Sequence, residues 1–212
     1  IYNNGIRNMV LDREEELSSG DMLMIVKNNY FWTEKEKKES GEGSAGAVPA
    51  FLANGDRAKV LRVSNYIELY GFRFATLLLQ LPDYDDYEMQ VTGMLDTLQS
   101  EAPALTHEQQ EELFRQVEED YQHFVPLKAD RMKSIRQDAY FNALQIKYAY
   151  AVTCHKAQGG QWAHVYVDQG YMTDDMLTPD YIHWLYTAFT RATDKLFLVN
   201  WPKEQTCEPT DL

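Results

Sequence analysis

The stretch from Thr153 to Trp162 gathers side chains that can bind a phosphate. It reads Thr-Cys-His-Lys-Ala-Gln-Gly-Gly-Gln-Trp and follows an apolar, strand-like run at residues 148–153. A hydroxyl, an imidazole, an ammonium group and glycine amides just past a strand's end resemble the ligand sites of open α/β sheets, and such amides can hold phosphate oxygens. A polar glycine loop without a ligand is the alternative. Zinc is not expected, because adjacent Cys154 and His155 lack a second pair of ligands.

A single arginine ends the second informative segment. The helix predicted at residues 179–192 reaches Arg191 near its end, and a tight turn then leads into an apolar strand at 195–200. The planar, permanently charged guanidinium of an arginine suits a phosphoryl group in a transition state. Taken singly, Arg191 can equally be a surface cation.

The elements around these residues predict an α/β segment in the last third of the chain. Its strands are expected at 148–153, 163–168 and 195–200, around the helix at 179–192. Upstream, the turn at Asn54-Gly55-Asp56 and several short apolar runs predict a small β-barrel or meander. These runs lie at residues 20–26, 57–63, 66–70 and 72–81.

Helices and a loop are expected in the remaining segments. Residues 1–16 are predicted to be a helix, and the Lys, Glu, Gly and Ser run from Glu34 to Gly46 a flexible loop. Thr106 and Gln109 have the spacing of a capping box, which predicts a helix start there. A second helix is expected over 129–145.

Charge is concentrated in one stretch of the chain. The net charge is −13, and residues 83–120 hold twelve acidic residues against one arginine, so the remainder is nearly neutral. The acidic stretch is interpreted as a solvated surface, and coating of nucleic acid by the whole protein surface is not expected. No apolar run is long enough for a transmembrane helix. Two cysteines and the start at Ile1 favour a cytoplasmic piece of a longer protein.

The two chemical segments together resemble motifs V and VI of superfamily 1 helicases. Thr-x-His-Lys-x-Gln-Gly is followed some thirty residues later by Tyr-Thr-Ala-x-Thr-Arg-Ala. Upstream, Gly20-Asp21, Asn28-Asn29-Tyr30 and Asn54-Gly55-Asp56 resemble the pattern of RecD-like enzymes, which are often named as the α subunit of exonuclease V.

The resemblance implies an α/β fold with insertions. A RecA-like domain of the P-loop NTPase type would be formed by residues 1–19 and 143–203. An SH3-like β-barrel at 20–96 and a helical acidic insertion at 97–142 would interrupt it, and 204–212 would be a C-terminal tail. The chain holds no Gly-x-x-x-x-Gly-Lys-[Ser/Thr] sequence and no Walker B motif, so this RecA-like domain would lack its own P-loop.

Four residues are implied on the ATP side. Arg191 matches the arginine finger of motif VI, and Thr190 matches a neighbour that packs against or orients it. Gly159 matches the motif V glycine near the γ-phosphate. Gln161 stands where many relatives have a Glu that contacts ribose.

The expected DNA side has five residues. Thr153 and His155 match positions that contact the single-strand backbone, with Lys156 beside them, and Gln158 would link the DNA and nucleotide sites. Tyr30, next to the expected barrel, is a candidate for stacking on a base.

The implied protein is an ATP-dependent DNA helicase that moves along single-stranded DNA and separates duplex at junctions, in DNA repair or recombination. ATP and Mg²⁺ would be bound mainly by an N-terminal RecA-like domain of the same protein, with no metal site in this chain. The isolated chain is therefore expected to be inactive. A non-motor module that binds nucleic acid or protein, and an RNA helicase of the same superfamily, are the alternatives.

Overall fold

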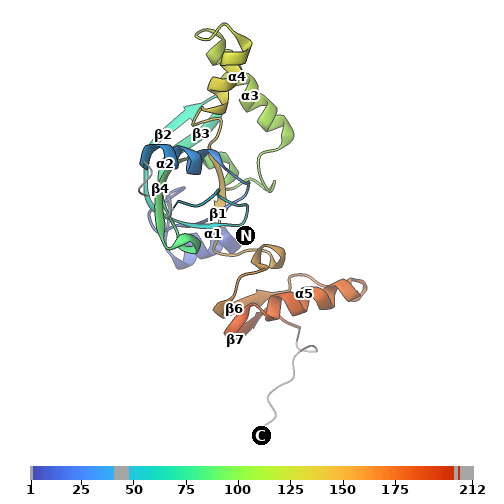
Figure 1. The fold of residues 1–212 in the computed structure, drawn as a ribbon. Coiled ribbons are helices and arrows are strands. Elements are labelled where there is room, and N and C mark those ends of the chain that lie inside the picture. The colour runs from blue at the N-terminus through green and yellow to red at the C-terminus, as the bar shows by residue number, and fades with distance from the viewer. Residues whose placement is uncertain (1, 41–47, 203–204, 206–212) are drawn as a thin grey trace. The chain divides into compact units, whose positions relative to one another are not determined.

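The chain forms two compact units, residues 1–151 and 152–212. The computed structural model describes residues 2–40, 48–202 and 205. The N-terminal unit is a closed five-stranded barrel with helices, and the C-terminal unit is built from two strands and a helix (Figure 1). Among the described residues, no helix is both long and apolar enough to cross a membrane.

The barrel predicted from the short apolar runs is present. Its strands are β1 (Met22–Ile25), β2 (Arg57–Leu69), β3 (Phe72–Leu81), β4 (Tyr87–Met94) and β5 (Leu144–Tyr148). Neighbouring strands are antiparallel except β4 and β5, which are parallel, and β5 closes the barrel by pairing with β1. Alternate residues of a strand face the same side, so Leu77, Leu79 and Leu81 of β3 all point into the core.

Strand β2 is continuous where the sequence predicted two strands. The predicted gap between residues 63 and 66 is an irregularity in the β2–β3 register, between Ser64 and Ile67. Asn65 lies there with φ of 50°, in the left-handed region that asparagine tolerates better than most residues. A bulge of this kind bends a strand without ending it, which the apolar pattern cannot distinguish from a turn.

The boundary expected at residue 143 differs from the observed one. Residues 143–203 were assigned to the RecA-like domain, and a strand was expected at 148–153. The structure instead places the strand at 144–148, inside the barrel, where Leu144 and Ile146 are completely buried. The barrel cannot close without this strand, because β1 and β4 have no other partner on that side. The division between the units therefore falls after Ala151.

A helix replaces the loop that was expected from Glu34 onward. Helix α2 spans Phe31–Ser40, and residues 41–46 of the expected loop lie outside the described residues. Its start is fixed by Asn29, whose side chain accepts from the Trp32 amide at 3.3 Å. The buried Trp32 indole donates to the Asn142 carbonyl at 2.9 Å. The residues from Glu34 to Glu39 are all charged, so no apolar period indicated this helix.

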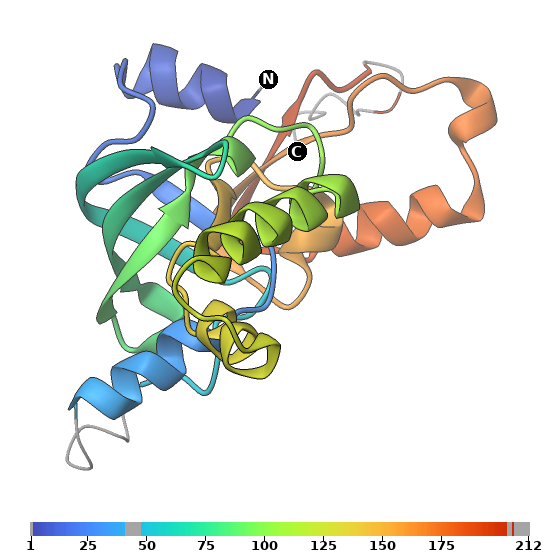
Figure 2. The same ribbon diagram turned by 90° about the horizontal axis from the view of Figure 1, so that it is seen from above.

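Helices α3 (His107–Gln122) and α4 (Lys128–Arg136) lie side by side (Figures 1 and 2). The predicted capping box is confirmed, because Thr106 and Gln109 exchange both bonds. The second helix was expected to reach residue 145, but it ends at Arg136. Leu113 and Val117 of α3 pack with Phe74 of β3 in a second core, so this insertion shares buried residues with the barrel.

The N-terminal segment is tied to the barrel by a buried carboxylate. The expected helix at 1–16 is shorter, with α1 at Tyr2–Gly5 and a π-helical turn at Ile6–Val10. Asp21, fully buried, accepts from Arg7 at 3.0 Å and from Arg13 at 2.6 Å. Tyr150, just after β5, donates to the same carboxylate at 2.5 Å. Three separate segments thus meet at one side chain.

These donors reverse the effect of burial on Asp21. Burial alone would raise the pKa of its carboxyl group, but the bonds from Arg7, Tyr150, Ser18 and Arg13 hold that pKa below its ordinary value. Burial and the bond to Asp21 raise the pKa of Tyr150 to about 12. A carboxyl group with a lowered pKa adds stability at neutral pH and loses it as pH falls through the folded-state value, below about 4.

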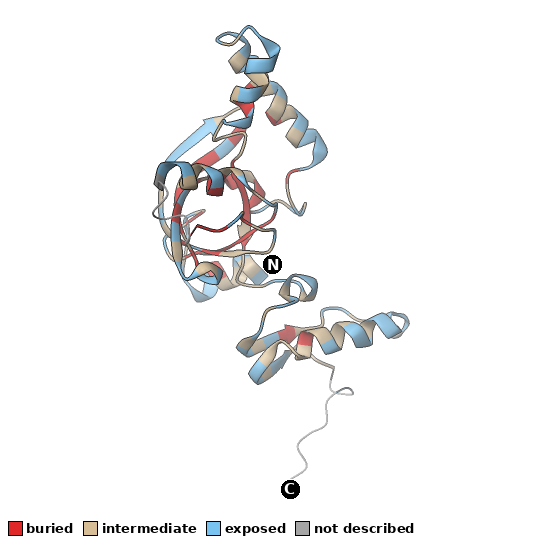
Figure 3. Cartoon of the chain, viewed as in Figure 1, coloured by how far each residue is buried: buried red, intermediate tan, exposed pale blue. Residues whose placement is uncertain are grey.

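The C-terminal unit is a parallel strand–helix–strand arrangement. Strand β6 (Trp162–Asp168) pairs with β7 (Ala192–Val199), and α5 (Pro179–Phe189) connects them. Of the described residues in this unit, only Val167 and Ala188 are buried (Figure 3). Parallel sheets normally have both faces covered, and here Tyr166 and Tyr186 are 69% and 72% exposed.

We expect Arg7→Ala to destabilise the N-terminal unit by about 3–5 kcal/mol, because one partner of a buried ion pair is removed and the charge on Asp21 loses its main donor. Hydrogen exchange of the β1 and β5 amides measures this loss directly. Arg57→Ala, which removes the exposed pair with Asp83, is the control and should cost less than about 1 kcal/mol. Equal protection in the two variants would show that the Asp21 cluster does not hold the barrel together.

Candidate phosphate and DNA site

The two motif-like segments meet at one edge of the C-terminal unit. Residues Cys154–Ala157 form a 3-10 turn that begins after Thr153, and β6 starts five residues later. The amide of Trp162 donates to the carbonyl of Arg191 at 2.9 Å, and the Gln161 side chain donates to the Thr190 carbonyl at 3.4 Å. Strand pairing therefore brings residues thirty positions apart into contact.

The Arg191 side chain is held by three hydrogen bonds. Its Nε donates to the Thr187 carbonyl at 2.9 Å, one terminal nitrogen donates to the Gly160 carbonyl at 2.9 Å, and the other to the Thr190 hydroxyl at 3.0 Å. A guanidinium has five N–H donors. The bonds among the described residues leave one hydrogen on each terminal nitrogen, which is the number that a bidentate contact with a phosphate needs.

The site lies at the amino ends of β6 and β7, and this corrects the expected placement. The sequence suggested a loop at the carboxyl end of an α/β strand, delivered by residues 148–153. Because β5 ends at Tyr148 and belongs to the barrel, the loop follows no strand of the two-stranded sheet. Trp162 and Ala192, the first residues of β6 and β7, are register partners beside the site.

Two glycines shape the turn for different reasons. Gly159 has φ of 85°, a left-handed conformation that side chains rarely adopt, and open space surrounds the position of a Cβ. A Cβ on Gly160 would lie 2.4 Å from the Trp162 ring. The Trp162 indole therefore packs directly on the peptide whose carbonyl receives Arg191.

Four of the five residues expected to contact DNA share one surface segment. Thr153, His155, Lys156 and Gln158 are all exposed. His155 and Gln158 also line an open pocket of about 560 Å³, together with residues of α5. The structure thus brings the turn residues together, as the sequence suggested, and adds a wall of α5 side chains that the sequence did not indicate.

That wall consists of two stacked rings. Tyr181 and Trp184, one helical turn apart on α5, have ring centroids 5.9 Å apart and nearly parallel planes. Cys154 closes the pocket beside them and donates to the Trp184 carbonyl at 3.6 Å. Burial raises the pKa of the Cys154 thiol, so it stays protonated at neutral pH. Among the described residues there is no cluster of side chains suited to a metal ion.

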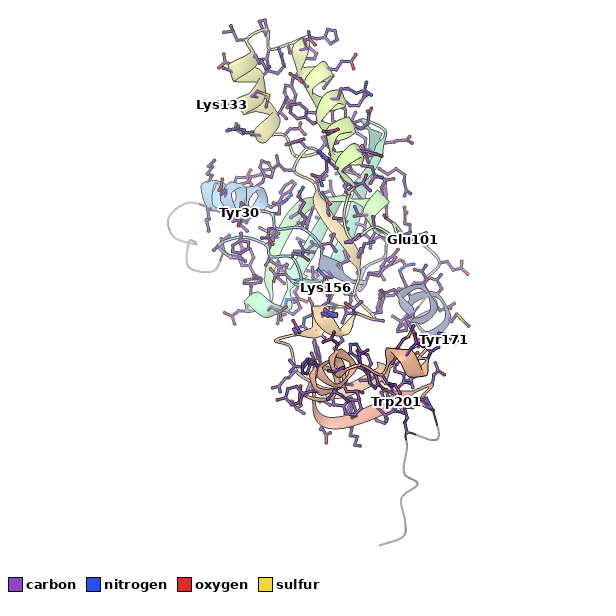
Figure 4. All side chains as sticks on the ribbon, turned by 90° about the vertical axis from the view of Figure 1, so that its right-hand side faces the viewer. Tyr30, Glu101, Lys133, Lys156, Tyr171 and Trp201 are labelled. Atoms are coloured by element: carbon purple, nitrogen blue, oxygen red, sulfur yellow. The ribbon has the colours of Figure 1, made fainter. Side chains whose placement is uncertain are left out.

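Tyr30 belongs to the other unit, directly before α2 (Figure 4). Its side chain is 53% exposed and stacks on Phe51, with ring centroids 4.9 Å apart. One face of the ring is covered by that contact. The sequence gave no sign of this stacking partner.

The end of the N-terminal unit, at residues 150–151, is held by hydrogen bonds that the sequence did not indicate. The Asn3 side chain accepts from the Ala151 amide at 2.8 Å and donates to the Ala151 carbonyl at 3.0 Å. Tyr150 is bound to Asp21 and Arg13. The backbone two residues before Thr153 is therefore fixed to the N-terminal helix. Only the Gly20-Asp21 pair pointed to this cluster in the sequence.

Comparison with known proteins supports a helicase. Residues 148–199 match the family of UvrD-like helicase C-terminal domains. This range is about a quarter of the chain, and it holds both motif-like segments with β6, α5 and β7. No curated protein sequence matches the chain significantly. Among solved structures, the Pif1 helicase of Candida albicans is similar with a TM-score of 0.42 and 14% identity, over 89% of this chain. The chain spans 33% of the length of that helicase.

We expect Gly160→Ala to displace Trp162 and break the bond between Arg191 and the Gly160 carbonyl, because the new methyl group overlaps the indole. The Nε–H resonance of Arg191 in an NMR spectrum reports the change. The double variant Gly160→Ala with Trp162→Phe removes the overlapping ring atoms and should restore the wild-type resonance. An unchanged spectrum in the single variant would show that the turn does not depend on this packing.

Proposed function

We propose that this chain is the C-terminal motor part of an ATP-dependent superfamily 1 DNA helicase of the RecD-like type. The complete protein moves along single-stranded DNA and separates the duplex at junctions. The C-terminal unit acts as the edge of a second RecA-like domain, and the barrel acts as its inserted SH3-like domain. The faces of the β6–β7 sheet are exposed in this unit. This exposure fits a larger domain whose further elements cover the sheet.

The observation that carries this proposal is the contact between Arg191 and Gly160. It joins the motif VI arginine to the motif V loop, and two N–H donors of the guanidinium remain. An arginine held in this way loses little conformational entropy when it binds a phosphate. The donors fit the γ-phosphate of an ATP molecule that another domain presents with Mg²⁺. When bound, ATP supplies the hydrolysis reaction and its free energy.

Each residue on the ATP side has a separate task. Arg191 stabilises the charge that develops on the transferred phosphoryl group. Thr190, bound to the guanidinium, keeps it oriented. The Gly159 amide faces the same phosphate. Gln161 is occupied with the Thr190 carbonyl, so it acts as a brace of the arginine more than as a ligand of ribose.

The exposed residues of the turn contact the DNA backbone. Thr153 and His155 donate to successive phosphates, and Lys156 adds a positive charge. Gln158 follows them in the same turn. A conformational change at the γ-phosphate of ATP is therefore transmitted through this short segment to the bound DNA strand. Closing of two domains around ATP then becomes one step along the DNA. Tyr30 stacks on a base with the ring face that Phe51 leaves open.

In the complete protein, Arg191→Ala should lower ATP hydrolysis by about 10³-fold or more while ATP still binds, as expected for an arginine finger. Steady-state ATPase assays and nucleotide titrations measure the two effects separately. Lys195→Ala, an exposed cation on β7, is the matched control and should leave turnover unchanged. The chain of 212 residues alone should hydrolyse no ATP, since it lacks a phosphate loop. Near-normal turnover of Arg191→Ala would refute the arginine-finger role.

Thr153→Ala and His155→Ala should weaken single-stranded DNA binding and reduce the DNA stimulation of the ATPase, with little change in ATP affinity. Backbone contacts position a strand without reading bases, so the loss should be similar for different sequences. DNA affinity at fixed salt is the measurement, with an RNA strand in parallel. Thr193→Ala and His107→Ala, also exposed, serve as controls. Unchanged affinity in both site variants would remove these residues from the DNA path.

A further inference from the structure

The α3–α4 arm is a rigid projection of the N-terminal unit. It consists of α3, the loop at residues 123–127 and α4, with the loop at the end far from the barrel (Figure 1). Buried Val117 and Ile135 join the two helices in the second core. Tyr70 donates to Asp120 at 3.1 Å and Tyr121 donates to Asp138 at 3.0 Å. These bonds brace α3 near its C-terminal end.

The loop at the tip of the arm is fixed by Arg131. Its guanidinium donates to the carbonyls of Val125, at 3.2 Å, and Pro126, and it pairs with Glu118 on α3. The amides of Phe124 and Val125 both donate to the Tyr121 carbonyl. The backbone of the tip is therefore held from both sides, so its side chains are presented in a defined arrangement.

This fixed loop presents two large apolar side chains to solvent. Phe124 is 78% exposed and Leu127 is 68% exposed. Neither belongs to the two hydrophobic cores. Exposed apolar residues on a preorganised support are typical of binding surfaces, because little conformational entropy is lost on association.

The outward face of α3 is acidic up to the tip. Glu108, Glu111 and Glu119 are exposed along it, and Arg115 is the one lysine or arginine of α3. Glu118, Glu119 and Asp120 crowd the C-terminal turns of α3, where the helix dipole disfavours negative charge. Glu118 pairs with Arg131 and Asp120 accepts from Tyr70, so these two carboxylates stabilise the arm itself. The exposed carboxylates of Glu108, Glu111 and Glu119 fit a positively charged surface placed against α3.

The charge of α3 also argues against DNA as the ligand of the arm. Phosphates would be repelled by the acidic face. The exposed cations Lys128, Lys133 and Arg136 lie on α4, the other helix of the arm, and Figure 4 labels Lys133 there. They would repel a basic partner there, and so direct it toward α3.

We propose that the α3–α4 arm docks a protein segment with an apolar, lysine- or arginine-rich surface. Phe124 and Leu127 insert between apolar side chains of that segment, and the acidic face of α3 pairs with its cations. This interaction is separate from ATP hydrolysis and from the turn that holds Thr153. This interaction gives the helical insertion a binding role of its own, separate from any role in the fold of the barrel.

The test uses the complete chain and a labelled amphipathic helical peptide of leucine and lysine. A second peptide with serine in place of leucine has the same charge and reports nonspecific attraction. Fluorescence anisotropy should show that the wild-type chain prefers the leucine peptide by about tenfold or more. Phe124→Ser with Leu127→Ser should abolish that preference, while Tyr171→Ser, with an equally exposed ring, should keep it. Leu127 is the N-cap of α4, where serine favours the helix, so folding is preserved.

The charged half of the surface has its own variants. Glu111→Gln with Glu119→Gln should weaken binding of both peptides. Asp85→Asn with Asp86→Asn, in the β3–β4 turn, removes the same charge from a region where φ is positive and asparagine fits, and should change neither. A leucine preference that survives the tip variant, or an equal effect of the two charge variants, would overturn the proposal. So would a tip-dependent affinity for forked DNA or a tip-dependent dimer in sedimentation, in place of peptide binding.

Discussion

The buried Asp21 carboxylate is the interaction on which the N-terminal unit depends. It joins the segment before β1, the first residues of the chain and the residues after β5. A buried charge is tolerated only when donors surround it, and here two arginines, a tyrosine hydroxyl and a backbone amide do so. Since Tyr150 is one of them, the same cluster decides where the barrel ends and where the backbone leading to Thr153 begins.

Strands β1 to β3, β6 and β7 could be predicted largely from the sequence, because their apolar patterns are local. Alternating apolar residues predicted β3. The polar turn with its two glycines, which precedes Arg191 in the sequence, indicated the candidate site. The assignment of β5 could not be predicted in this way. Its apolar residues fit an α/β strand and a barrel strand equally, and the pairing with β1 across more than a hundred residues decides between them. Helix α2 was missed because a single buried tryptophan and an asparagine cap anchor it, not an apolar stripe.

The candidate site shows the same division between local and long-range information. Types and spacing suggested which residues bind phosphate, but not the bond from Arg191 to Gly160 or the packing of Trp162 on that peptide. Tyr181 and Trp184 were hidden as well, since an aromatic pair one turn apart is as typical of a core as of an exposed wall. The missing information in each case is which face of an element lacks a neighbour, and that is a property of the tertiary structure.

The register of β6 and β7 has a consequence for how this unit can change over evolution. Trp162 and Ala192, the first residues of β6 and β7, are register partners. Their pairing keeps the turn next to Arg191, whatever the length of the connection that follows the carboxyl end of β6. The connection from the end of β6 to the start of α5, residues 169–178, begins at the carboxyl end of β6 and lines the pocket beside the turn with Gln169, Met172 and Met176. Insertions and deletions there leave the distance between the two motifs unaltered. Homologues should therefore differ in length in this connection far more than in the helix that returns the chain to Arg191.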